Sequence, residues 1–193
     1  MLRTRKYLLA AAAVATALAL SGCAGGTAGT DMGSTPGMTS TPTATASANA
    51  ADVTFAQMMI PHHEQAVEMS DVILARDGID QRVLDLATQI KAAQKPEITQ
   101  LKAWLTAWGA DDGGMSGMGG MSSDDMTALQ SASGVAASKM FLEQMTLHHQ
   151  GAIVMAQTEL DSGQNADAKV MATAIVTTQT DEIAVMTDIL AAL

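Results

Sequence analysis

Apolar residues in the part of the chain after residue 51 recur at three- and four-residue intervals, and extended strand-like alternation is absent. This pattern predicts an all-α fold. Glycines that follow helical stretches, and Asp or Asn residues that precede them, divide the region into main helices. We expect four, at about 52–76, 80–108, 123–160 and 165–193, with Asp52 and Asn165 as caps and Gly134 as a point where the third helix can be interrupted.

The four predicted helices form a repeat of two hairpins. The stretch around His62-His63 aligns with the stretch around His148-His149 at an offset of 86 residues. The second and fourth helices align at an offset of 85, where Ile90, Gln94, Glu97, Ile98 and Leu101 match Ile175, Gln179, Glu182, Ile183 and Met186. Two hairpins of one design bury their apolar faces by packing together, so the sequence predicts a four-helix bundle with pseudo-two-fold symmetry. The repeat halves are about 52–108 and 123–193.

Two prolines interrupt the agreement between the halves. Pro61 and Pro96 lie inside the first and second helices, where the third and fourth have Leu147 and Asp181. A proline inside a helix removes a hydrogen bond and crowds the preceding turn, so we expect a kink or local irregularity at each.

The N-terminus predicts export. Three basic residues precede an apolar run over residues 7–20, and Leu20-Ser21-Gly22-Cys23 follows with the form of a bacterial lipobox. We expect a lipoprotein signal peptide over 1–22, removal of that segment, and acylation of Cys23, which would anchor the protein to the outer face of the cell membrane. Residues 23–51, rich in Gly, Ser, Thr, Ala and Pro, are expected to form a disordered tether.

Charge and cysteine content narrow the function further. Without the basic signal segment, 7 Lys and Arg remain against 20 Asp and Glu, a net charge of −13. Nucleic-acid binding needs clustered Lys and Arg, so this acidity argues against it. It favours the accumulation of cations near the protein surface. Cys23 is the one cysteine of the chain, and its acylation leaves neither a disulfide nor a thiolate metal site.

The candidate chemistry lies in the two repeated His-His motifs, which contain all four histidines of the chain. On a regular helix, the histidines of each copy and two methionines fall within an arc of about 120°, with an alanine near its middle. The alternative is that the methionines fill the core and the histidines are partly exposed. Because the arrangement occurs twice, we predict a metal site with the ligands His62, His63, His148, His149, Met59, Met69, Met145 and Met155.

Copper is the expected metal. Di-iron bundles carry Glu-x-x-His pairs, whereas this chain has Met59-x-x-His62 and Met145-x-x-His148. A thioether in place of a carboxylate favours Cu(I) over iron, manganese and magnesium. A mixed site that takes Cu(II) or Zn(II) stays open, since the carboxylates Glu64, Glu68 and Glu143 are close in sequence, although such side chains are commonly solvated.

A loop between the halves, at 110–122, has a methionine at every third position among glycines. It has no apolar periodicity, and a flexible Met-x-x-Met-x-x-Met segment can wrap Cu(I) with sulfur ligands. We expect an auxiliary metal site at Met115, Met118 and Met121, which Met32, Met38 and Met126 could extend. The alternative is low-complexity drift.

These motifs carry a family resemblance. Phe55-x-x-Met58-Met59-x-Pro61-His62-His63-x-x-Ala66-x-x-Met69, its second copy, and Ile90-x-x-x-Gln94-x-x-Glu97-Ile98 resemble the DUF305 family over essentially all of 52–193. The resemblance implies a ferritin-like bundle, a secreted or lipid-anchored bacterial protein, and copper binding with a part in copper resistance. It also implies the four histidines as ligands and the four methionines as soft partners.

Three functions are open at this point. The first is a copper-binding protein for sequestration, tolerance or transfer, which would exchange metal with a donor or acceptor protein. The second is a redox metalloenzyme, such as a metal oxidase, using the same residues. The third is a metal-free interaction scaffold. The sequence contains no spare histidine or cysteine for nucleophilic catalysis, which argues against an enzyme of that class. Oligomeric state is not indicated.

Overall fold

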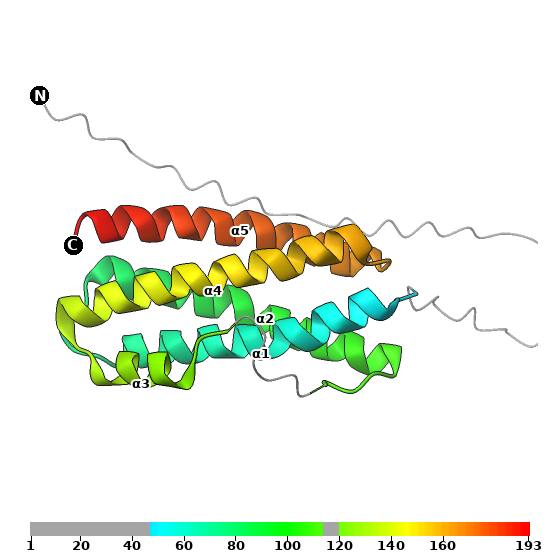
Figure 1. Ribbon diagram of the computed structural model, residues 1–193, viewed down its shortest axis with the longest axis horizontal. Helices are drawn as coiled ribbons and strands as arrows, with labels where there is room; N and C mark the ends of the chain where they lie inside the picture. The colour runs from blue at the N-terminus through cyan, green and yellow to red at the C-terminus, as the bar shows by residue number, and fades with distance from the viewer. Residues whose placement is uncertain (1–46, 114–119) are drawn as a thin grey trace, which may run out of the picture. The chain divides into compact units, whose positions relative to one another are not determined.

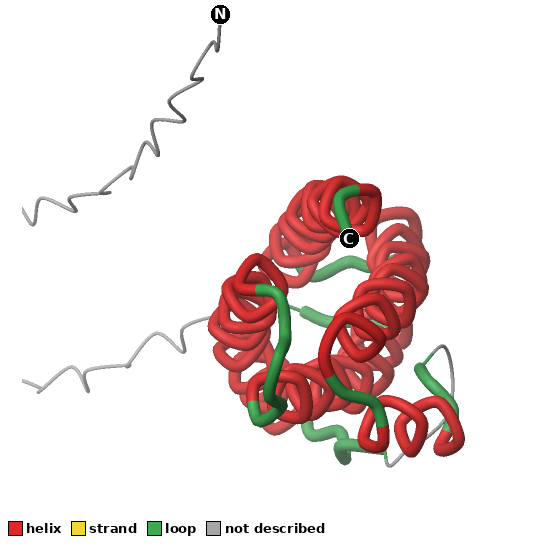
Figure 2. Tube along the Cα trace, turned by 90° about the vertical axis from the view of Figure 1, so that its left-hand side faces the viewer, coloured by secondary structure: helices red, strands yellow, loops and turns green. Residues whose placement is uncertain are grey.

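The computed structural model describes residues 47–113 and 120–193, which contain helices and no strands (Figure 1). The helices are α1 (Ala50–Leu74), α2 (Gln81–Trp108), α3 (Ser123–Ser131), α4 (Gly134–Ser162) and α5 (Ala166–Ala191). The four long ones form two antiparallel hairpins, α1 with α2 and α4 with α5, joined through the packing of α1 on α4. Seen end-on, they surround a common axis, with α3 outside them (Figure 2). The predicted all-α bundle of two hairpins is confirmed.

The start of α1 differs from the prediction. Asn49 is the N-cap, and Asp52, predicted as the cap, occupies the third helical position in a capping box with it. Asp52 is fully buried and also accepts hydrogen bonds from the backbone N–H groups of Gln164 and Asn165, 3.0 and 2.8 Å away. Asp52 therefore joins the beginning of α1 to the turn between α4 and α5, a contact that the local pattern could not reveal.

The predicted third helix is interrupted, as Gly134 suggested, and becomes α3 and α4. Gly134 has a φ of 57°, and its N–H donates to the carbonyl of Asp77 at 3.3 Å. A Cβ atom on Gly78 would lie 3.4 Å from the Cα atom of Gly134. The close approach of these two glycines brings the break between α3 and α4 against the turn between α1 and α2.

Neither internal proline divides its helix. α1 continues through Pro61 and α2 through Pro96. Tertiary packing of both helices offsets the lost hydrogen bonds.

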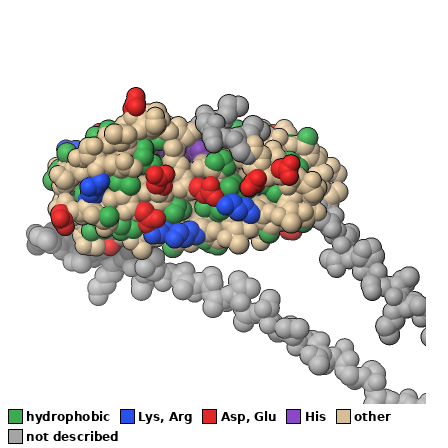
Figure 3. Space-filling view, turned by 90° about the horizontal axis from the view of Figure 1, so that it is seen from below, with side chains coloured by type: hydrophobic (Ala, Val, Ile, Leu, Met, Phe, Trp, Pro, Cys, Tyr) green, Lys and Arg blue, Asp and Glu red, His purple; other side chains and the backbone are tan. Residues whose placement is uncertain are grey.

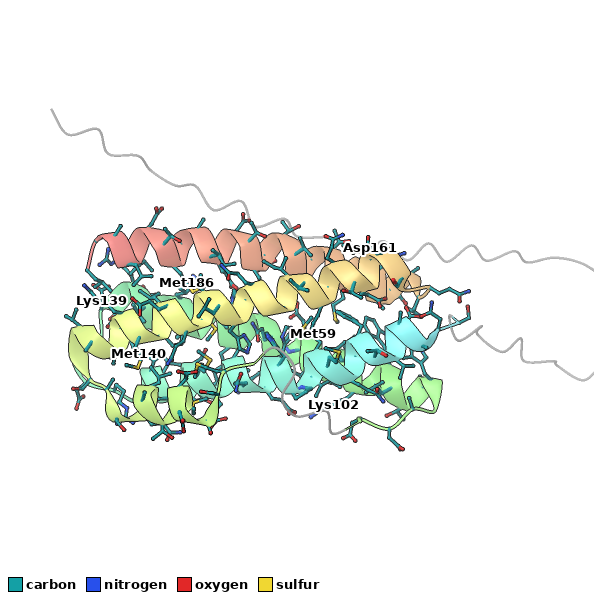
Figure 4. All side chains as sticks on the ribbon, in the orientation of Figure 1. Met59, Lys102, Lys139, Met140, Asp161 and Met186 are labelled. Carbon is teal, nitrogen blue, oxygen red and sulfur yellow. The ribbon has the colours of Figure 1, made fainter. Side chains whose placement is uncertain are left out.

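The core consists of two hydrophobic clusters, one toward each end of the bundle. One contains Phe55, Leu101 and Ala156, from the first half of α1 and the later parts of α2 and α4. The other contains Ile73 and Phe141, from the later part of α1 and the beginning of α4. The histidines lie between the two clusters, because they follow Ile60 and precede Ala66 on α1. Figure 4 shows Met59 near this middle region and Met186 nearer the free end of α5.

The predicted signal peptide (1–22), Cys23 and most of the tether lie outside the described residues, as do Met32, Met38, Met115 and Met118. Across 47–113 and 120–193, no helix has both the length and the apolar character needed to cross a membrane.

Candidate metal centre

The structure brings all four histidines into one buried layer. His62 and His63 come from α1, and His148 and His149 come from α4, with no more than 3% of any of them exposed. The rings of His62 and His148 face each other across the α1–α4 contact, with centroids 3.7 Å apart and planes inclined by 36°. The two histidines of each helix are adjacent residues. Because a regular helix turns about 100° per residue, the second ring of each pair points toward the other helix of its own hairpin, α2 or α5.

Those second rings each bind a carboxylate. His63 Nε2 lies 2.8 Å from Glu97 Oε2 on α2, and His149 Nε2 lies 2.7 Å from Glu182 Oε2 on α5. A carboxylate accepts a proton, so the pairing assigns the ring proton to Nε2. The Nδ1 atoms of His63 and His149 are buried and have no hydrogen-bond partner among the described residues. Each is therefore a buried lone pair that is available for a metal.

Glu97 and Glu182 are site residues that the sequence interpretation did not select. Their side chains are 24% and 14% exposed, which is less than expected for solvated carboxylates on an outer helix. Beside them, Gln94 and Gln179 are almost fully buried, and the Oε1 atom of each lacks a hydrogen bond within the described part of the chain. The signal was present in the sequence, because both Gln/Glu pairs align between the two halves.

The surroundings of His148 favour its neutral form. Burial lowers the pKa of His148 well below its usual value of 6.5, and repulsion from the other three histidines lowers it further, while the nearby backbone of His62 opposes the shift weakly. Neither ring nitrogen of His148 has a hydrogen-bond partner of normal geometry among the described residues. Neutral imidazole is the form that binds metals.

The candidate methionines lie on both sides of this layer. Met59 and the partly buried Met155 belong to the cluster around Phe55, whereas Met69 and Met145 belong to the cluster around Phe141. This pairing across the halves follows from the antiparallel packing of α1 and α4. Each side of the layer thus receives one thioether from each helix.

The sequence also left carboxylate ligands open, and the structure does not bring them to the layer. Glu64, Glu68 and Glu143 are exposed. Glu64 instead pairs with Lys102 at 2.6 Å. No group of three or more His, Cys, Asp or Glu side chains within 47–113 and 120–193 is arranged to hold a metal ion. A metal in the layer therefore requires thioether ligands, or a rotation of the rings upon binding.

Of the loop methionines, only Met121 is described, and it is partly buried against the cluster around Phe141. Met126 on α3 is a core residue, 9% exposed.

Comparisons with known proteins agree with this fold. A family model described as "Domain of unknown function (DUF305)" matches residues 52–190. A DUF305 fragment from Deinococcus radiodurans is 32% identical, covering 76% of this chain and 99% of its own, with a TM-score of 0.70. A DUF305 protein from Streptomyces coelicolor is 34% identical, covering 73% and 91%, with a TM-score of 0.69.

A third similar structure is CopM in its Cu(I)-bound form, which is 28% identical, covering 71% of this chain and 93% of its own, with a TM-score of 0.63. No functionally curated protein matches the sequence. The match of the family model over most of the chain, together with these solved structures, shows that the protein belongs to the DUF305 family.

Proposed function

We propose that this protein binds copper, with Cu(I) preferred, in the buried layer of His62, His63, His148 and His149. The observation that carries the proposal is the pair of buried Nδ1 atoms without hydrogen-bond partners on His63 and His149, each on a ring whose Nε2 atom binds a glutamate. A histidine that ligates a metal commonly donates its other nitrogen to a carboxylate, which orients the ring and raises its basicity. The same arrangement in both halves makes an accidental origin of the pairs improbable.

The methionines support a soft metal. Thioethers above and below the imidazole layer suit Cu(I) and suit zinc, iron or manganese poorly. Water does not compete well for such a site, because the surrounding clusters are apolar and close-packed. The likeness to CopM, solved with Cu(I), Cu(II) and silver at 27–28% identity to this chain, supports the same class of metal.

In the proposed role the protein acts outside the cytoplasm, anchored through Cys23, and sequesters copper or passes it to a partner protein. We propose binding rather than turnover, since the imidazoles of the layer are buried and are 3% exposed at most. A redox enzyme would need a substrate to reach the metal through this packing.

The metal preference predicts a thermal shift. Cu(I) at about 1,000 times its Kd should stabilise the fold by roughly 4 kcal/mol and raise Tm by about 10 °C, because it binds the native state and not the unfolded chain. Zn(II) and Cu(II) at the same concentration should raise Tm less. The measurement is a melt of the metal-free protein titrated anaerobically with each ion. Absence of a shift with all three ions would contradict copper binding and favour the scaffold function.

The glutamates provide a second prediction. Glu97→Gln with Glu182→Gln should weaken Cu(I) binding by about 10- to 100-fold, because an amide no longer fixes the ring proton on Nε2 as a carboxylate does. The measurement is competition with a chromophoric Cu(I) chelator. Glu64→Gln is the matched control, since this exposed residue pairs with Lys102 and should leave the affinity unchanged. Equal affinity in the double variant and the control would mean that the glutamates only stabilise the fold.

A further inference from the structure

Two glutamines on α1 hold the ends of the Met/Gly loop beside the histidine layer. Gln57 Nε2 donates to the carbonyl of Asp111 at 2.9 Å. Gln65 Nε2 donates to the carbonyl of Met121 at 2.9 Å, and its Oε1 accepts from the N–H of Met121 at 2.6 Å. Gln65 thus binds the backbone of Met121 at two points, close to His62 in the sequence of α1.

The glycines at both ends of the loop are required by these contacts. A Cβ atom on Gly113 would lie 2.8 Å from Cδ of Gln57, and one on Gly120 would lie 2.5 Å from Oε1 of Gln65. The positions equivalent to Gln57 and Gln65 in the second half are Glu143 and Gly151. The repeat therefore departs from symmetry where the first half holds the loop.

Beside Met121 a surface pocket of about 170 Å³ reaches the layer. Its lining residues are Gly120, Met121, Asp125, Gln144, Leu147 and His148. His148 is 3% exposed, and neither of its ring nitrogens has a hydrogen-bond partner of normal geometry among the described residues. The buried Oε1 atom of Gln144 is also without a donor in the described part of the chain, while its Nε2 donates to the carbonyl of Asp125 at 3.2 Å. Figure 3 shows a small area of histidine surface on the face of the bundle seen from below.

We propose that this pocket is a second, surface metal site, in which the thioether of Met121 and a ring nitrogen of His148 bind Cu(I) before it enters the buried layer. This inference rests on the proposed function, because it assigns to that function the route by which the metal arrives. Gln65 is a positioning residue, which holds Met121 at the pocket through its backbone.

The chemistry of the lining fits a soft monovalent cation. A thioether and a neutral imidazole are ligands that Cu(I) prefers, and the exposed carboxylate of Asp125 at the rim attracts a cation without burying a charge. His148 belongs to both sites, since its ring also faces that of His62 at 3.7 Å. An ion held by His148 can therefore pass inward by exchanging its other ligands while it stays on one imidazole.

The direct test uses protein labelled with ¹³C at the methionine methyl groups and titrated with Ag(I), a redox-inert substitute for Cu(I). The Met121 resonance, identified by its loss in Met121→Leu, should shift with the first additions of Ag(I). It should also shift in a His63→Ala/His149→Ala variant, which retains the residues that line the pocket but lacks the buried Nδ1 atoms of these two histidines. An unmoved Met121 resonance in both proteins would overturn the proposal, and Met121 would then be a packing residue only.

The kinetic test separates this site from the buried layer. Met121→Leu and Gln65→Leu should each slow the transfer of Cu(I) from a chelator to the protein by about tenfold. The final occupancy of the buried layer should not change, because neither residue belongs to that layer. Gln65→Glu, which keeps the acceptor for the Met121 N–H, should restore part of the rate. Met140→Leu is the matched control, since this partly buried methionine on α4 does not line the pocket.

These experiments distinguish failure of the surface site from failure of the proposed copper binding in the buried layer. If Met121→Leu loads copper as fast as Met140→Leu to full occupancy, the surface site is wrong and the buried layer stands. If the Met121 resonance responds to Ag(I) but the wild-type protein retains no Cu(I) against the chelator, the surface site is supported and the buried layer is wrong.

Discussion

Replacing His62 and His148 together by alanine is expected to weaken Cu(I) binding by at least about 100-fold, which corresponds to roughly 2.7 kcal/mol of binding free energy. The two rings lie 3.7 Å apart at the contact between α1 and α4, so the double change removes the centre of the proposed site. The measurement is anaerobic competition with a chromophoric Cu(I) chelator.

The control for this experiment is Gln150→Ala. Gln150 lies on α4, as His148 does, and follows His149 in the sequence, but it is exposed to solvent. It should bind Cu(I) as the wild-type protein does. Circular dichroism and a melt of each metal-free variant check that the bundle is retained, since a buried cavity itself destabilises a fold. Undiminished affinity in the folded double variant would remove the histidine layer from the proposed function.

The second large effect concerns a buried pair of carboxyl groups at the end of the bundle where α1 begins. Glu159 on α4 is 1% exposed, and burial followed by the neighbouring Asp52 raises its pKa from 4.5 to about 8. Burial also opposes ionisation of Asp52, but hydrogen bonds from Asn49, Asn165, Glu159 and Gln164 outweigh it and lower the pKa of Asp52. Glu159 therefore keeps its proton at neutral pH, beside the Asp52 carboxylate.

The sign of the pH dependence follows from the raised pKa. Between pH 4.5, where the unfolded Glu159 loses its proton, and about pH 8, where the folded one does, the native state holds more protons than the unfolded state. The stabilisation by protonated Glu159 is thus complete below pH 4.5 and is lost as the pH rises through 8. Glu159→Gln, which mimics the neutral acid, should gain about 2–4 kcal/mol in free energy of unfolding relative to wild type between pH 5 and 9.

Urea denaturation of the metal-free wild-type and Glu159→Gln proteins at pH 5, 7 and 9 measures the difference in their free energies of unfolding. The histidines are common to both proteins, so their contribution cancels in the comparison. Asp161→Asn, exposed on the same helix and labelled in Figure 4, is the control, and its difference from wild type should not change with pH in this way. A pH-independent difference for Glu159→Gln would mean that Glu159 is ionised in the folded protein.

Local patterns in the sequence determined most of the fold. Helical periodicity, together with Gly109 and Asn165 at helix boundaries, located α1, α2 and α5 to within a few residues, and the predicted third helix contains both α3 and α4. The 86-residue offset predicted two hairpins, because a repeated amphipathic unit can bury its apolar face only against its partner. The same offset identified all four histidines that the structure brings together, since their restriction to two copies of one motif does not depend on tertiary contacts.

The partners of these side chains were decided only by the tertiary structure. Asp52 was misassigned as a cap although Asn49 offers the same local signal three residues earlier, and its contacts with Gln164 and Asn165 were missed because they join segments more than 100 residues apart. Glu97 and Glu182 stand on helices other than those of their histidines, so no spacing within one helix relates them. The antiparallel packing of α1 and α4 likewise pairs Met59 with Met155. The sequence alone pointed to the histidines and methionines of the candidate site, because the motif that contains them is local. Which of them meet depended on how the helices pack, because those contacts are made across the bundle.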